Sequence, residues 1–133
     1  MKVLHVAGKR KRSIARATIR QGDGKVRINR LLLDCYMPKL ARMKVREPLL
    51  LAGDVANKLD IDINVRGGGF MSQAEAARLV VATAIVDFTK NSKLEQAFLK
   101  YDRQLLVADV RRKETRKPNR HSKARAKVQK SYR

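Results

Sequence analysis

The sequence predicts a single domain built from both β-strands and α-helices, followed by a long basic extension. Apolar and polar residues alternate over 59–66, which predicts a strand with one buried face. Apolar residues then recur at helical spacing over 72–90 and leave few polar positions, which predicts a buried helix. A chain of 133 residues is long enough for one hydrophobic core.

Charge is distributed unevenly along this chain. The net charge of +20 divides into +9 over 1–30, +1 over 31–110 and +10 over 111–133. The charge pattern therefore predicts a globular domain over 1–110 with a cationic start, and a basic tail over 111–133. Because like-charged segments repel each other, we expect a polyanionic partner, and nucleic acid is the leading candidate.

The tail, 111–133, has too few apolar residues to bury a core of its own. Ordering its backbone would cost about 1–2 kcal/mol per residue, so we expect it to be disordered when free. Such a segment orders against RNA phosphates as counterions are released. A nuclear-localisation signal or a solvated tail is the alternative, but neither accounts for the second basic cluster near the N-terminus.

Basic residues also line the predicted strands near the N-terminus. An extended segment over 2–6 precedes an expected basic loop over 8–12. Alternation over 15–20 and 26–28, with a Gly-Asp-Gly turn between them, predicts a hairpin. The polar side of this hairpin carries Arg16, Arg20, Lys25 and Arg27. Solvation alone would explain a face of mixed charge, but this stretch holds a single acid, so we expect the face to meet phosphate.

Three consecutive glycines, residues 67–69, separate the predicted strand from the long helix. They permit a sharp turn and the close approach of another segment or a ligand. Ser72 with Glu75 predicts a capping box at the helix start, and Asn91 predicts its end. The Walker, dinucleotide-binding and KH glycine patterns are each incomplete here. We therefore expect tight strand-to-helix packing, although the amides could also bind a phosphate.

Two further helices are expected on either side of the long one. The prolines of Met37-Pro38 and Glu47-Pro48 should break any long element, leaving a short helix over 49–52 that ends at Gly53. A second capping box, Ser92 with Glu95, should start the last helix. One face of that helix holds Leu94, Ala97, Phe98 and Tyr101.

Few residues suggest catalysis or metal binding. Cys35 cannot form an intrachain disulfide, and with His5 and His121 it makes no zinc-like set, so we expect no metal and no cofactor. No apolar run reaches the ~18 residues of a membrane span, and no signal-peptide pattern opens the chain. We expect a soluble intracellular protein.

Aromatic residues are scarce. Four of the six, namely Phe70, Phe88, Phe98 and Tyr101, are expected in the core or at its edge. Little remains for base stacking, so RNA recognition should rest on shape and backbone.

Several short segments, in their order and spacing, resemble the universal small-subunit ribosomal protein nine family. They are GKRKRSIARA (8–17), GDGKVRIN (22–29), VREPL (45–49), VRGGG (65–69), SQA (72–74) and QKSYR (129–133). The Tyr-Arg ending and LLVADVRRKE (105–114) resemble the archaeal and eukaryotic branch. Two departures stand out: Arg30 replaces a glycine often found there, and residues 119–123 lack a glycine-rich spacer.

This resemblance implies an α+β fold like the second domain of small-subunit ribosomal protein five. In that fold a small sheet is backed by two helices, with a left-handed crossover. The resemblance further implies a structural, non-enzymatic protein of the cytoplasmic small ribosomal subunit, acting in translation. Its partners would be ribosomal RNA in the head, neighbouring head proteins and, through the tail, the peptidyl-site tRNA, with no membrane.

The predicted contacts with ribosomal RNA are basic residues of the N-terminal stretch, the sheet and the tail. They are Lys9, Arg10, Lys11, Arg12, Arg16, Arg20, Lys25, Arg27, Arg66, Arg111, Arg112, Lys113, Arg116, Lys117, Arg120, Lys123, Arg125 and Lys127. The residues predicted near tRNA are Lys130, Ser131, Tyr132 and Arg133. Two other classes stay open. A free RNA chaperone or DNA-compacting protein would explain the charge, and a small-molecule kinase would share a related fold.

Overall fold

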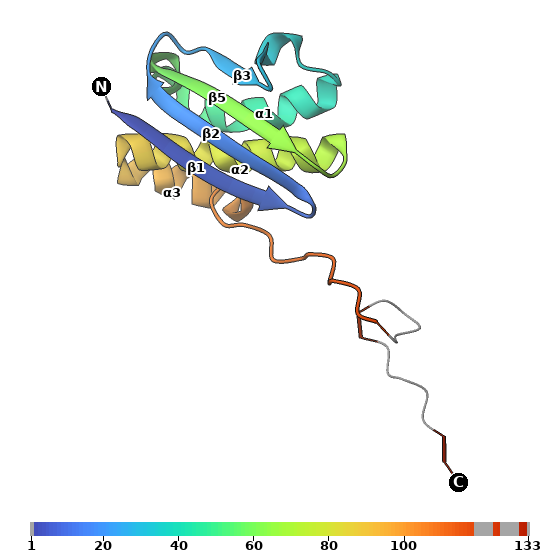
Figure 1. The fold of residues 1–133 in the computed structure, drawn as a ribbon. Coiled ribbons are helices and arrows are strands. Elements are labelled where there is room, and N and C mark those ends of the chain that lie inside the picture. The colour runs from blue at the N-terminus through green and yellow to red at the C-terminus, as the bar shows by residue number, and fades with distance from the viewer. Residues whose placement is uncertain (1, 119–123, 126–130, 133) are drawn as a thin grey trace.

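A computed structural model describes residues 2–118, 124–125 and 131–132. It shows a mixed sheet of five strands with three α-helices on one side of it, which confirms the α+β prediction (Figure 1). The strands are β1 (Val3–Arg10), β2 (Ser13–Gln21), β3 (Val26–Ile28), β4 (Leu31–Leu32) and β5 (Leu59–Arg66). They lie in the order β1-β2-β5-β3-β4.

The N-terminal hairpin is formed by β1 and β2, which pair antiparallel. The expected basic loop over 8–12 is therefore only a turn at Lys11 and Arg12, since β1 continues to Arg10. The predicted pairing of 15–20 with 26–28 is wrong, because β5 lies between β2 and β3. β5 pairs with β2 over eight residue pairs, whereas β3, with three residues, could form far fewer.

Asp60 shapes the turn that carries the chain from β2 across β5 to β3. Its Oδ1 accepts the backbone amides of Lys25 at 2.9 Å and Asp23 at 3.0 Å. These hydrogen bonds, that of Lys25 foremost, lower the pKa of Asp60. Gly22 fits against this carboxylate because a Cβ there would fall 2.2 Å from its carbon. Asp60 thus organises this turn from its place on β5.

The α-helices are α1 (Lys39–Ala52), α2 (Phe70–Thr89) and α3 (Ser92–Tyr101). Short 3-10 turns span Leu33–Cys35, Gly53–Lys58 and Arg103–Leu105. Helices α1 and α2 lie side by side behind the sheet, and α3 packs against both (Figure 1). The sheet is therefore backed by α1 and α2, and α3 is the third helix expected along the chain.

Helix α1 is longer than predicted because Pro48 does not break it. The short helix predicted over 49–52 is instead the last turn of α1, although its predicted end at Gly53 is confirmed. A proline inside a helix costs about 3 kcal/mol through a lost hydrogen bond and steric conflict. Here the ring is fully buried on the same face as Val45, and this burial offsets the loss.

Helix α2 begins at Phe70, before the predicted capping box. Gly69 is its N-cap, and no side chain caps the helix. The carbonyl of Gly69 accepts the amide of Gln73 at 2.9 Å. The predicted Ser72–Glu75 capping box is therefore wrong. The helix starts before Ser72, directly after Gly69, whose backbone is extended as an N-cap residue requires.

The second predicted capping box is wrong as well. Asn91 is the N-cap of α3, and its side chain accepts the amide of Lys93 at 3.1 Å. Helix α2 ends one residue earlier, with Lys90 in the left-handed conformation. Asn91 thus begins a helix rather than ending one.

The core lies between the inner face of the sheet and the helices. Its sheet side is aliphatic, with Ile19, Ile61 and Val65 among the buried residues. Phe98 is fully buried, but Phe70 and Tyr101 are 56% and 58% exposed. The expectation that these two aromatics lie in the core or at its edge is wrong, because each sits exposed at the end of a helix.

The glycine corner lies against the β1–β2 turn. A Cβ on Gly67 would fall 2.7 Å from the carbonyl oxygen of Arg12, and one on Gly68 would fall 2.2 Å from Oγ of Ser13. Both glycines have positive φ, 77° and 66°. Oγ of Ser13 also donates to the carbonyl of Gly67 at 2.8 Å. The corner therefore serves close packing, as the sequence predicts.

Candidate nucleic-acid interface

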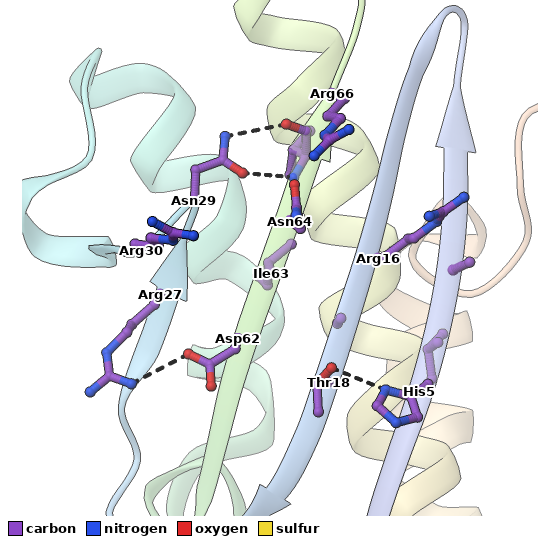
Figure 2. Close-up of a pocket in the computed structure, with 14 residues that line it drawn as sticks. His5, Arg16, Thr18, Arg27, Asn29, Arg30, Asp62, Ile63, Asn64 and Arg66 are labelled. Carbon is purple, nitrogen blue, oxygen red and sulfur yellow. Dashed lines mark hydrogen bonds and ion pairs between the residues drawn. The ribbon is translucent and has the colours of Figure 1, made fainter.

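The face of the sheet opposite the helices holds an open concavity of about 1180 Å³. Alternation along β2, β3 and β5 places the buried aliphatic residues inward and polar residues outward. The side chains around the concavity include Arg16, Arg27, Arg30, Asn64 and Arg66 (Figure 2). The predicted outward position of Arg16 and Arg27 is confirmed.

The cations of this face divide into neutralised and free ones. Asp62 pairs with Arg27 at 3.4 Å and with Arg20 at 3.6 Å. Three others have no carboxylate partner among the residues the structure describes, and we call them the outer-face arginines: Arg16, Arg30 and Arg66. Figure 2 shows them around Asn64, which is the register partner of Arg16. This end of the concavity therefore carries uncompensated positive charge.

Arg30 is held at the rim by its neighbour Asn29. The Asn29 side chain bonds both polar groups of the Val65 backbone: Nδ2 donates to the carbonyl at 3.2 Å, and Oδ1 accepts the amide at 2.9 Å. It thereby extends the pairing of β3 with β5 past the end of the strand. Both Asn29 and Arg30 have positive φ, 49° and 70°. The turn after β3 thus keeps a backbone conformation that favours glycine, although Arg30 occupies the position.

Arg30 is a candidate that sequence reasoning missed. The one feature of the sequence that could have identified it is the replacement noted above, an arginine where a glycine is often found. A side chain added at such a turn projects outward without filling the core, and here it is exposed at the concavity.

The N-terminal basic cluster does not act as one surface. Lys11 and Arg12 are exposed in the turn, and Lys9 is half-buried. Arg10 points to the helical side, where its side chain is 15% exposed and pairs with Glu75 at 2.8 Å. Lys25 precedes β3 and pairs with Asp23 at 3.3 Å.

Beyond Leu105 the described part of the tail, 111–118, has no helix or strand and is exposed. Arg111 pairs with Asp109 at 2.8 Å, and Nε of Arg125 donates to Glu114 at 2.8 Å. This exposed stretch contains four of the predicted RNA contacts: Arg112, Lys113, Arg116 and Lys117. Further on, Ser131 and Tyr132 are also exposed. Outside the described residues lie Arg120, Lys123, Lys127, Lys130 and Arg133.

A buried ion pair fixes the helices beneath the interface. Arg78 of α2, 10% exposed, lies 2.6 Å from a carboxylate oxygen of Glu47 and 2.9 Å from one of Asp102. Its contact with Glu47 lacks hydrogen-bond alignment and is an ion pair only. Partial burial disfavours the charged form of Asp102, yet the amide of Gln104 and the Arg78 guanidinium bring its pKa below the ordinary value. This network ties α1, α2 and the end of α3 together.

Within 2–118, 124–125 and 131–132 no cluster of three or more His, Cys, Asp or Glu side chains could hold a metal ion. In the same residues, every helix is too short or too polar to cross a membrane.

The family model described as "Ribosomal protein S9/S16" matches residues 8–133. The chain belongs to this family. It is 52% identical to the small ribosomal subunit protein uS9 of Methanococcus maripaludis (strain C7), over the whole of both chains. It is 50% identical to the protein of the same name from Methanococcus vannielii, again over both whole chains.

These matches confirm the resemblance to the small-subunit ribosomal protein nine family and to its archaeal branch. The chain is a ribosomal protein with a structural role in translation, and it is not an enzyme. The kinase alternative is thereby excluded.

Proposed function

We propose that the protein is a structural component of the small-subunit head, where its globular domain binds ribosomal RNA and its tail reaches the peptidyl-site tRNA. The observation that carries the proposal is the uncompensated charge of the outer-face arginines, in a chain that matches a ribosomal family over 8–133. Neighbouring proteins of the head are further partners. A free RNA chaperone would not need this fixed arrangement of one charged face.

The chemistry of the face favours phosphate contacts over base reading. Arginine presents a planar fork of donors that matches two phosphate oxygens, and such contacts fix the position of RNA without reading sequence. The aromatic residues Phe70 and Tyr101 are exposed, but neither lines the concavity. The interface therefore suits the shape and backbone of folded RNA.

The globular domain and the tail differ in how they become ordered. Residues 1–110 fold without RNA, and the fully buried Phe98 and Leu105 support this because both belong to a core built within that range. The tail, 111–133, becomes ordered on RNA, using Arg112 and Arg116 together with the cations that follow.

The end of the tail, 130–133, meets a partner that is not permanently present. Tyr132 is 88% exposed, and an aromatic ring beside cations can contact both base and phosphate. Deleting 131–133 should weaken tRNA binding at the peptidyl site and leave subunit assembly intact. One lost charged contact is worth about 1.5–3 kcal/mol before neighbouring RNA contacts compensate.

Two measurements test this proposal. Sedimentation of cell extract should show one copy of the chain per small subunit, and a free chaperone would not co-sediment stoichiometrically. Filter binding should then compare tRNA affinity between subunits carrying the full chain and subunits carrying the 131–133 deletion. Equal affinity at equal protein occupancy would remove the tRNA contact from the proposal.

A further inference from the structure

Arg10 differs from the other cations of the N-terminal cluster in the direction of its side chain. Alternation along β1 places it on the same face as Val6, toward the helices. Its Nε donates to Oε2 of Glu75 in α2 at 2.8 Å, and its side chain is only 15% exposed. Lys11 and Arg12, which follow it, are exposed. An arginine held in this way has little left to offer a phosphate.

The second partner of Arg10 is Asp109, where the tail leaves the domain. Nη1 lies 3.3 Å from Oδ2 of Asp109 without hydrogen-bond alignment, so this contact is an ion pair. The Asp109 side chain is 7% exposed and also accepts the backbone amide of Arg111 at 2.9 Å and its Nη2 at 2.8 Å. The side chain of Arg111, followed by its amide, lowers the pKa of Asp109 to about 2. The carboxylate is charged throughout the physiological range.

These contacts join two segments that would otherwise repel each other. The net charge is +9 over 1–30 and +10 over 111–133. Glu75 and Asp109 place negative charge beside Arg10, and Asp109 also binds Arg111 at the start of the tail. The start of the tail is thereby tied to the end of the β1–β2 hairpin.

We infer that Arg10, Glu75 and Asp109 form a clamp that holds the start of the tail against the β1–β2 hairpin. The clamp presents the cationic turn and the cationic tail to one stretch of RNA. Arg10 is then a positioning residue rather than a phosphate ligand. The inference rests on the proposed RNA-binding function, because pre-aligning two binding segments matters only if both bind the same partner.

Variants matched in charge separate this clamp from general electrostatics. Asp109→Asn removes a clamp charge, whereas Asp87→Asn removes an exposed acid that has no partner in the described chain. Arg10→Lys keeps the charge but loses the fork that spans two carboxylates. Arg103→Lys makes the same change at an exposed position outside the proposed RNA surface.

The geometry of the clamp can be measured without RNA. Nitroxide labels on the native exposed Cys35 and on a Val110→Cys site, 88% exposed in the unchanged chain, report the distance across the domain by electron–electron resonance. The distance distribution should broaden roughly twofold in the Asp109→Asn and Arg10→Lys proteins, since a restrained segment becomes a flexible chain. It should stay unchanged in the two control proteins.

Binding to small-subunit ribosomal RNA gives the second readout. Asp109→Asn adds one unit of positive charge, so electrostatics alone predicts tighter binding, as for Asp87→Asn. The clamp predicts the opposite sign, a loss of roughly tenfold, because the turn and tail no longer bind as one pre-aligned unit. Arg10→Lys should lose affinity similarly, while Arg103→Lys should change the affinity little.

The outcomes decide separate questions. An unchanged distance distribution in Asp109→Asn overturns the clamp, and so does an affinity equal to or above that of Asp87→Asn. If the unchanged chain itself fails to bind ribosomal RNA, the proposed function falls, while the label distances still decide whether the clamp exists.

Discussion

Arg30 is a position at which stability and RNA binding should respond in opposite directions. Its φ of 70° lies in the left-handed region, which costs about 1–2 kcal/mol for a residue with a side chain. Glycine removes that strain but loses more entropy on folding, by about 0.5–1 kcal/mol. Arg30→Gly should therefore raise the free energy of unfolding by about 0.5–1 kcal/mol, or the melting temperature by roughly 4 °C.

The same substitution removes one of the three outer-face arginines. Binding to small-subunit ribosomal RNA should lose one phosphate contact, so the log-log salt slope should become shallower by about 0.7–0.9. Arg30→Ala is the matched control, since it removes the same cation and keeps the backbone strain. It should flatten the slope equally without stabilising the domain.

Urea unfolding and filter binding over a series of KCl concentrations measure the two effects separately. Equal unfolding free energies of the Gly and Ala variants would refute the strain at this turn. A salt slope unchanged in both variants would refute the assignment of Arg30 to the RNA interface.

The remaining predictions concern the glycine corner, the buried ion pair and the acid response. Gly67→Ala should destabilise the domain by about 2 kcal/mol, because φ is positive and the new Cβ meets backbone, whereas Gly69→Ala, with open space around it, should change unfolding by under about 0.5 kcal/mol. Arg78→Met should cost about 3 kcal/mol in thermal unfolding, since two carboxylates lose their partner; a near-neutral result would show that water already compensates them. The pKa of Asp109 falls from 3.8 to about 2 on folding, so its contribution to stability is present above about pH 4 and is lost as pH drops toward 2. Carboxyl NMR titration should find that value, and a midpoint near 4 would contradict the pairing with Arg111.

Local patterns in the sequence were sufficient for the elements with a strong period. The strand at 59–66 and its outward polar face follow from alternation, and the end of α1 at Gly53 follows from the C-terminal role of glycine. The glycine corner was likewise recognisable as a site of close packing. Each of these depends on residues near one another in the chain.

The predictions of secondary structure fail where residues far apart in the sequence determine the structure. Adjacent strands 15–20 and 26–28 looked like a hairpin, but β5, more than thirty residues later, competes successfully for β2. Pro48 looked like a helix breaker because sequence alone does not show that its ring would be buried. Both errors come from tertiary packing overriding a correct local tendency.

The candidate site was predictable in charge but not in its pairing. Arg16 and Arg66 could be placed on the outer face from period alone, whereas the fate of Arg10 depended on β1 continuing through the basic cluster. Once β1 is known to reach residue 10, the same alternation points that side chain inward. Nothing in the sequence indicated that Asp62 would pair with Arg27 and neutralise its charge.

The most direct test of the RNA interface compares two triple variants of equal charge. One carries Arg16→Gln, Arg30→Gln and Arg66→Gln on the outer face of the sheet. The other carries Lys93→Gln, Lys100→Gln and Arg103→Gln, exposed on α3 and the turn that follows it. Binding of each full chain to small-subunit ribosomal RNA is measured over a range of salt. The outer-face variant should flatten the log-log slope by about 2.1–2.7, and the helix-side variant should leave it nearly unchanged. Equal slopes for the two variants would contradict the assignment of the RNA surface to the outer face.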